Sequence, residues 1–262
     1  MLRIPGRLGR LLRPMVRAES VLQSLRNLPR TDCRTLVGAQ PVLVLAPHPD
    51  DESLGCGGLL AACQEYGLDA YVMVLTDGCG SHPRSREYPP ARLATTRASE
   101  ARSAIRALGL DDDRIEFLGL PDGHAPTRGA RFDAVVSCVA AYARARGIGT
   151  VCTTWLHDPH PDHQAAYYIG QRVAWQIGAR SLYYPVWGWT VPPDAWLPAT
   201  PVFGACLDIA RQLAAKRRAI ACHRSQYTDL IRDDPSAFRL SPAVLALFDR
   251  PFEVFCEIPD VG

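Results

Sequence analysis

The sequence predicts an α/β fold: a mostly parallel sheet with helices on both faces, in a single domain. Three observations predict it. Short aliphatic runs alternate with segments of helical spacing along most of the chain, which is the order of a parallel sheet. The first run, PVLVLA at 41–46, is rich in β-branched residues and does not alternate, as expected of a strand buried on both faces. Polar loops follow several of the predicted strands.

The predicted elements follow one another in regular order. Gly67 and Gly109 mark the ends of two predicted helices. Gly55, Gly57 and Gly58 are expected to form the turn into the first helix. Strands are predicted at 41–46, 70–78, 114–123, 150–155, 181–187, 202–208 and 252–258. Helices are predicted at 57–67, 91–109, 131–146, 162–178 and 209–223.

Composition narrows the class of protein. With 262 residues and 47% hydrophobic residues, the chain can bury the core of one large domain. A net charge of +2 does not indicate nucleic-acid binding. No run of about 18 apolar residues occurs, so we expect no membrane span. The nine cysteines form no CxxC pair, which argues against a disulfide framework and favours a reducing, cytoplasmic location.

Residues 1–40 are expected to form a basic N-terminal arm in front of a domain at 41–262. The arm is rich in leucine and arginine, which suits a short amphipathic helix packed on the domain, or a partly disordered arm. Basic amphipathic helices also bind membrane surfaces, so a peripheral membrane contact through residues 1–34 is the alternative. A secretory signal is not expected, because the arm has no continuous apolar segment.

Two clusters of histidines and carboxylates stand at strand ends of the predicted sheet. PHPDDE at 47–52 follows the first strand, and HPDH at 160–163 follows the fourth. In open parallel sheets, ligands bind beyond the carboxyl ends of the strands, so we expect the clusters to meet. Together they offer nitrogen and oxygen ligands without a thiolate, a set that suits Zn²⁺ or Fe²⁺. A dication would also neutralise the adjacent carboxylates.

Spacing separates the residues within each cluster. His48 and Asp51 are three apart, as are His160 and His163, and such pairs share one face at the start of a helix. The aspartate inside each pair then points elsewhere. Taken alone, an Asp-Asp-Glu run before a helix is usually a capping device, and a single histidine on a turn is usually structural. Two such clusters at equivalent strand ends favour a joint site.

The clusters resemble the paired signatures of the N-acetylglucosaminylphosphatidylinositol de-N-acetylases, the PIG-L or LmbE-like family. LTDG, RASEARSAIRALG, LPDG and KRRAIACHRSQ are similar to further family motifs, so the resemblance covers residues 41–228. It implies a Rossmann-like fold and a zinc-dependent N-deacetylase, a hydrolase of amide bonds that acts on N-acetylglucosaminyl compounds. The implied partner is an amino sugar, either a small molecule or linked to a lipid or glycan. Cys79 departs from the polar or acidic residue that family members often carry there.

The family pattern implies a role for each residue that matches it. It makes His48, Asp51 and His163 the metal ligands, with Zn²⁺ expected and Fe²⁺ as the alternative. Three protein ligands leave positions open for water and substrate, as a catalytic site requires. The pattern makes Asp50 the general base, which takes a proton from the attacking water.

Four further residues are implied around that centre. A protonated His160 would assist at the oxyanion, and Asp162 would orient it. Arg97 would hold a sugar hydroxyl or phosphate, and Asp122 a sugar hydroxyl. The structural alternatives are a surface ion pair between Arg97 and Glu100 and a simple turn role for Asp122.

Other motif residues are expected to support the site. Glu52 is expected to bind backbone amides of its own loop. Two roles are open for the tryptophans Trp187, Trp189 and Trp196. They could pack in the core or in loops, or they could form an aromatic wall for a sugar face or an acyl chain. Structural or supporting roles are expected for His223, Ser225 and Gln226.

Two other functions stay open from the residues alone. An amidase acting on another N-acyl group, such as a longer acyl chain or a thiol conjugate, would use the same side chains. A non-catalytic sugar-binding protein with the same fold would need neither the metal nor the base. The chain carries every residue that the metal and the base require, which argues against the non-catalytic alternative.

Overall fold

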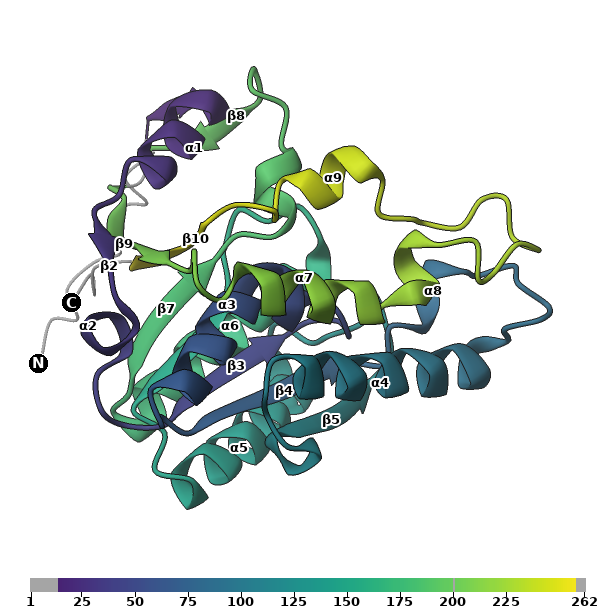
Figure 1. Cartoon of the computed structure of the whole chain (residues 1–262), viewed down its shortest axis with the longest axis horizontal. Helices are drawn as coiled ribbons and strands as arrows, with labels where there is room; N and C mark the ends of the chain where they lie inside the picture. Colours follow the sequence, from purple (N-terminus) through teal and green to yellow (C-terminus); the bar gives the residue numbers. More distant parts are fainter. Residues whose placement is uncertain (1–13, 200, 258–262) are drawn as a thin grey trace, which may run out of the picture.

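An eight-stranded sheet forms the centre of the chain, with the strand order β2-β9-β10-β7-β6-β3-β4-β5 (Figure 1). The computed structural model describes residues 14–199 and 201–257. Strands β7, β6, β3, β4 and β5 run parallel to one another, whereas β10 is antiparallel to both β7 and β9. The predicted fold class, a mostly parallel sheet flanked by helices, is confirmed.

The strands and helices follow the predicted order, with shifted ends. The sheet strands are β2 (Arg30–Thr31), β3 (Val42–Ala46), β4 (Ala70–Thr76), β5 (Ile115–Leu120), β6 (Thr150–Thr154), β7 (Arg180–Tyr184), β9 (Phe203–Asp208) and β10 (Phe252–Glu257). The helices are α1 (Ala18–Arg26), α2 (Cys33–Val37), α3 (Asp51–Glu65), α4 (Pro90–Ala107), α5 (Gly129–Ala145), α6 (Pro161–Ile177), α7 (Leu213–Cys222), α8 (Arg224–Tyr227) and α9 (Pro242–Ala246). Short 3-10 turns follow β4 at η1 (Cys79–Ser81) and β7 at η3 (Trp187–Thr190).

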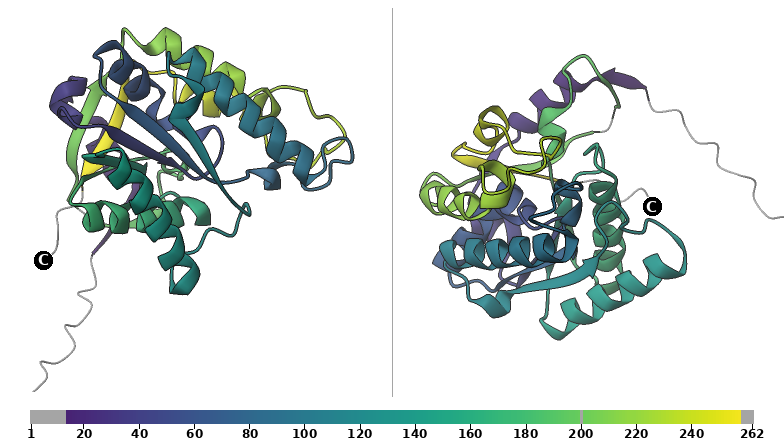
Figure 2. Two further views of the ribbon diagram at one scale, coloured as in Figure 1. Left: turned by 90° about the horizontal axis from the view of Figure 1, so that it is seen from below. Right: turned by 90° about the vertical axis from the view of Figure 1, so that its right-hand side faces the viewer.

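The helices cover both faces of the sheet (Figure 2). Alternate residues of β3 show the division: Val42 and Val44 pack in one core with α3 and α4, while Leu43 and Leu45 pack in the other with α5 and α6. Every residue of β3 is fully buried, which explains why its sequence does not alternate. Burying one such aliphatic side chain contributes about 1.5–3 kcal/mol to folding, so β3 holds the residues that follow it firmly.

Helix α3 begins six residues earlier than predicted, at Asp51 instead of residue 57. The expectation that the glycines form a turn was therefore wrong, because Gly55, Gly57 and Gly58 lie inside the helix. They are small for close packing: a Cβ on Gly55 would lie 2.3 Å from the ring of Tyr184. The first cluster of the sequence thus sits on the first turn of a helix.

The described part of the N-terminal arm packs on the sheet. Strand β2 pairs with β9, and Leu22 and Leu25 of α1 are buried against Trp155. Strand β1 (Met15–Arg17) pairs with β8 (Trp196–Pro198) in a separate two-stranded sheet. No helix among the described residues is long and apolar enough to cross a bilayer. Contact with a membrane surface, and a boundary at residue 40, stay predictions.

A buried ion pair joins α7 to the last strand and to α3. Glu253 accepts from Lys216 Nζ (2.7 Å) and from the backbone N–H groups of Gly58 and Leu59 (2.7 and 2.8 Å), and both charged side chains are only 2% exposed. We expect Lys216→Met to lower the free energy of unfolding by about 3–5 kcal/mol, because it leaves a buried carboxylate without its cation. Denaturant unfolding measures this loss.

The matched control for that variant is Arg217→Met, which removes an exposed pair with Asp249. Exposed pairs contribute little, so this variant should unfold near the wild-type midpoint. Equal midpoints for both variants would contradict a stabilising role for Lys216.

Candidate active site

A cavity of about 580 Å³ opens at the carboxyl ends of the parallel strands. Residues that follow four of the parallel strands line it, including Asp51 after β3, Gly80 after β4, Asp122 after β5 and His160 after β6. The two sequence clusters therefore meet, as expected. A larger groove of about 960 Å³ is lined by other residues, such as Trp175, so chemistry rather than size identifies the site.

Asp50 lies between β3 and α3 in a strained backbone conformation. Its φ of 149° makes it the only non-glycine residue with positive φ among the described residues. Such conformations cost about 1–3 kcal/mol and persist only when neighbouring contacts enforce them. Here the N–H of Asp50 donates to Glu52 Oε2 (2.9 Å). The carboxylate of Asp51 accepts from the N–H of His48 (2.9 Å) and fixes the same turn.

The side chain of Glu52 is held in place by Ser53 and His223. Its Oε1 accepts from Ser53 Oγ (2.7 Å) and lies 3.1 Å from His223 Nε2, and all three side chains are buried. Burial acts to lower the pKa of His223, but the adjacent Glu52 carboxylate outweighs it and raises the pKa. Glu52 thus binds a backbone amide, and His223 supports Glu52.

We expect Glu52→Ala to lower kcat by about 10²-fold with a smaller effect on KM, because a misplaced catalytic group costs about that much. Glu52→Gln keeps an oxygen that can accept from the N–H of Asp50, so it should restore most of the activity. Steady-state kinetics and metal analysis of both variants test this. Equal losses in the two variants would contradict a positioning role for the side-chain oxygen.

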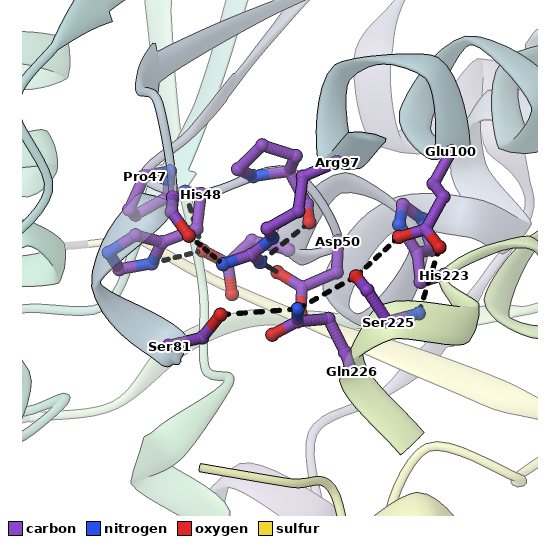
Figure 3. A network of polar contacts seen from close by, with 12 residues as sticks. Pro47, His48, Asp50, Ser81, Arg97, Glu100, His223, Ser225 and Gln226 are labelled. Atoms are coloured by element: carbon purple, nitrogen blue, oxygen red, sulfur yellow. Dashed lines mark hydrogen bonds and ion pairs between the residues drawn. The ribbon is translucent and has the colours of Figure 1, made fainter. Parts of the chain in front are cut away.

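Arg97 of α4 points at Asp50 from the other side (Figure 3). Its Nη2 lies 3.1 Å from Asp50 Oδ1 and donates to the carbonyl of Pro49 (2.8 Å), and Nη1 donates to the carbonyl of Gly78 (2.8 Å). Gly78 has φ of +65°, and a Cβ there would lie 2.7 Å from Nη1. Groups of the chain itself therefore occupy both terminal nitrogens of Arg97.

The pKa of Asp50 is raised to about 6, mainly by burial, while the charge of Arg97 acts in the opposite direction. A carboxyl with this pKa suits a general base near neutral pH. Arg97 is 3% exposed, and the surface ion pair considered for it with Glu100 is not observed. Instead Glu100 accepts from the N–H and Oγ of Ser225 (2.8 and 2.6 Å; Figure 3).

The two histidine clusters converge on Asp51. Its Oδ2 lies 3.2 Å from His48 Nδ1 and 3.2 Å from His163 Nε2. Two other groups of three residues also have possible metal-ligand atoms within 4.8 Å of one another. They are His48 with His160 and His163, and His48 with Asp122 and Asp162. The predicted ligands are therefore together, but so are neighbours that could replace Asp51 in the ligand set.

His163 carries the clearest mark of a metal ligand. It is fully buried, its Nδ1 lies 2.9 Å from Asp158 Oδ2, and its Nε2 makes no well-aligned hydrogen bond, with Asp51 Oδ2 3.2 Å away. Because a carboxylate only accepts, Nδ1 carries a proton, and Nε2 is the nitrogen that faces Asp51. Burial lowers the pKa of His163, but the carboxylates of Asp51 and Asp158 raise it to about 9, so a cation bound at Nε2 would replace a proton there. A histidine that donates its other N–H to a carboxylate is the usual arrangement around metals. These residues fit a dication.

Asp158 is a functional residue that the sequence analysis did not assign. Its carboxylate accepts from the N–H groups of Val186, Trp187 and Gly188 (3.0, 3.1 and 2.6 Å). These contacts aim Asp158 at His163 and attach the loop after β7 to the site. The available signal was its place in the loop between β6 and α6, five residues before the predicted ligand His163.

Asp162 and His160 are placed differently from their predicted relation. The carboxylate of Asp162 accepts from the N–H groups of Gly123 and Ala125 (2.7 and 2.9 Å), and its Oδ2 lies 3.2 Å from His48 Nε2. The backbone N–H of Asp162 donates to His160 Nδ1 (3.2 Å). This leaves the proton of a neutral His160 on Nε2.

Electrostatics favour that neutral form of His160. Burial lowers the pKa of His160, with a further contribution from the nearby histidines His48 and His163. The ring lies edge-on to His48, with centroids 4.6 Å apart. His160 can therefore donate a hydrogen bond without being protonated, in contrast to the imidazolium expected from the family pattern.

The sequence of the chain is similar to those of several deacetylases. A diacetylchitobiose deacetylase of Thermococcus kodakarensis is 31% identical over 49% of this chain and 47% of its own length, so the chain spans about half of that protein. A 1D-myo-inositol 2-acetamido-2-deoxy-alpha-D-glucopyranoside deacetylase of Rhodococcus opacus is 27% identical over 71% of this chain and 82% of its own length.

A solved structure confirms the fold. The N,N'-diacetylchitobiose deacetylase from Pyrococcus horikoshii superimposes with a TM-score of 0.61 at 22% identity, over 85% of this chain and 88% of that chain. The model of the family described as PIG-L, GlcNAc-PI de-N-acetylase, matches residues 43–174, half of the chain and both motif clusters. The chain therefore belongs to the PIG-L family.

Proposed function

We propose that the chain is a metal-dependent hydrolase that removes the N-acetyl group from an N-acetylglucosamine-type sugar in a glycoconjugate. The observation that carries the proposal is the buried centre of His48, Asp51 and His163 beside Asp50, whose raised pKa suits a base. The deacetylase names of the relatives support the same reaction.

The predicted ligands His48, Asp51 and His163 would hold the ion, Zn²⁺ by the ligand set and Fe²⁺ as the alternative. The ion would supply Lewis acidity, which polarises the amide carbonyl and acidifies a water. Asp158 keeps His163 in the tautomer that binds a cation through Nε2. The surrounding carboxylates favour a dication in this place.

The residues of the chain divide the proton transfers between them. Asp50 takes a proton from the attacking water and returns it to the departing amine, and Arg97 holds its carboxylate in place. His160 donates from Nε2 to the oxyanion, a contribution of about 3–4 kcal/mol per donor in acyl-transfer sites. Asp122, anchored by the N–H of Gly80 (2.9 Å) at the cavity wall, is available to a sugar hydroxyl.

The test is a mass-spectrometric screen for acyl loss over a panel of N-acylated amino sugars with metal-loaded protein. We expect loss of an acetyl group from at least one N-acetylglucosaminyl compound, and none after the metal is removed. A faster reaction with long-chain N-acyl sugars would favour the broader amidase. Absence of acyl loss from every compound, with ligand binding intact, would favour the non-catalytic alternative.

A further inference from the structure

Two aromatic side chains form one wall of the cavity beside the predicted metal ligands. The ring of Trp187 lies 6.5 Å from that of His163 and 5.3 Å from that of Phe238, edge to face with the latter. Both rings line the cavity, and Phe238 is 46% exposed. A single exposed aromatic is ordinary, but a pair that lines a cavity marks a ligand-binding surface.

Phe238 is held in place by the segment 228–241, between α8 and α9. Its N–H donates to the carbonyl of Ser81 (2.9 Å). Asp233 of the same segment accepts from Ser85 Oγ (2.7 Å) and so attaches it to the loop after β4. Figure 1 shows these two loops side by side. The segment lies beyond the part of the chain that the family model matches.

The wall runs from Trp187, beside the predicted ligand His163, to the exposed Phe238 at the cavity mouth. The predicted ligands His48, Asp51 and His163 are at most 7% exposed, so the amide has to reach the bottom of the cavity. Atoms remote from the amide then lie towards the mouth, where Phe238 is exposed. The aromatic pair is therefore placed to contact what the amino sugar carries.

Charge at the cavity argues against an anionic group in that position. Among the described residues that line it, Arg97 is the only arginine or lysine, and its terminal nitrogens already bind Asp50 and backbone carbonyls. Asp50, Asp51 and Asp122 also line the cavity. A phosphate needs free arginine, lysine or N–H donors, and the described lining of the cavity has no free arginine or lysine.

We propose that Trp187 and Phe238 form a subsite for a neutral group with an apolar face, such as a second sugar ring or an aryl group, attached to the N-acetylated sugar. A substrate with a phosphate in that position is disfavoured. The inference rests on the proposed function for its reaction, and concerns the part of the substrate that the reaction leaves untouched.

The experiment compares kcat/KM for free N-acetylglucosamine, an aryl N-acetylglucosaminide and N-acetylglucosamine 1-phosphate. Trp187→Ala and Phe238→Ala should reduce the preference for the aryl compound over the free sugar by about 10-fold or more, the scale of losing apolar contact in a pocket. Trp175→Ala, which alters an exposed tryptophan of the other groove, should leave the preference as it is. Phe238→Arg should raise the relative use of the phosphate compound.

Calorimetric binding of the aryl compound to each variant is measured in parallel. If no compound loses its acetyl group but both alanine variants bind the aryl compound more weakly, the proposed function fails and the subsite stands. An unchanged preference and unchanged binding in both alanine variants would overturn the subsite. A wild-type preference for the phosphate compound would do the same.

Discussion

Replacing Asp50 by asparagine is expected to lower kcat by about 10²–10⁴-fold, the usual contribution of a positioned general base, while the protein still binds its metal. The amide has nearly the shape of the carboxylate and can accept from Arg97, which lies 3.1 Å from Asp50 Oδ1. It cannot take a proton from water. Steady-state kinetics and metal analysis of the purified variant measure the two effects.

Asp249→Asn is the matched control for that substitution. It makes the same chemical change in an exposed carboxylate that pairs with Arg217 and does not line the cavity, and it should retain far more activity. If Asp50→Asn lost its metal, Asp50 would be a ligand rather than the base. If it kept wild-type kcat, another group would perform the proton transfer.

The core of the site could be predicted because its residues lie in two short motifs. His48, Asp50 and Asp51 follow one buried strand, and His160 and His163 follow its neighbour in the sheet. Parallel topology brings strand ends together regardless of the hundred residues between them. The chemistry of the side chains then limits the ligands they can hold.

Contacts that depend on tertiary packing could not be read in the same way. Asp158 contacts backbone amides after β7, and Phe238 is placed at the cavity by contacts of its loop with Ser81 and Ser85. The early start of α3 was missed because glycine usually breaks helices, whereas here Tyr184 and Ile209 occupy the space of the missing side chains. No local pattern shows which partner will fill that space.

The strain at Asp50 shows a similar limit. A positive φ at an aspartate is unfavourable in isolation, and no residue pattern in PHPDDE predicts it. The structure compensates through Glu52, which binds the N–H of Asp50, and through His223 from the far end of the chain. The sequence predicts supporting roles for Glu52 and His223, but only the fold shows that the residue they support is Asp50.

Removing His163 is expected to strip the metal from the protein and abolish hydrolysis. His163→Ala deletes the fully buried imidazole that Asp158 orients, so the ion would lose one of its three predicted protein ligands. Asp158→Asn keeps His163 but weakens its orientation, and should reduce metal affinity by about 10–100-fold. Competition with a chelator of known affinity, together with elemental analysis, gives both numbers.

The same measurement decides between the ligand sets that the geometry allows. If Asp51 completes the site with His48 and His163, the Asp51→Asn variant should release the metal. The His160→Ala variant should then keep the metal, and its kcat should fall by about 10²–10³-fold, as when an oxyanion donor is removed. If His160 is the third ligand, the two results are exchanged. The first outcome is expected, because Asp51 Oδ2 lies 3.2 Å from both His48 and His163, whereas His160 already accepts at Nδ1 from the N–H of Asp162 and so presents Nε2–H as a donor.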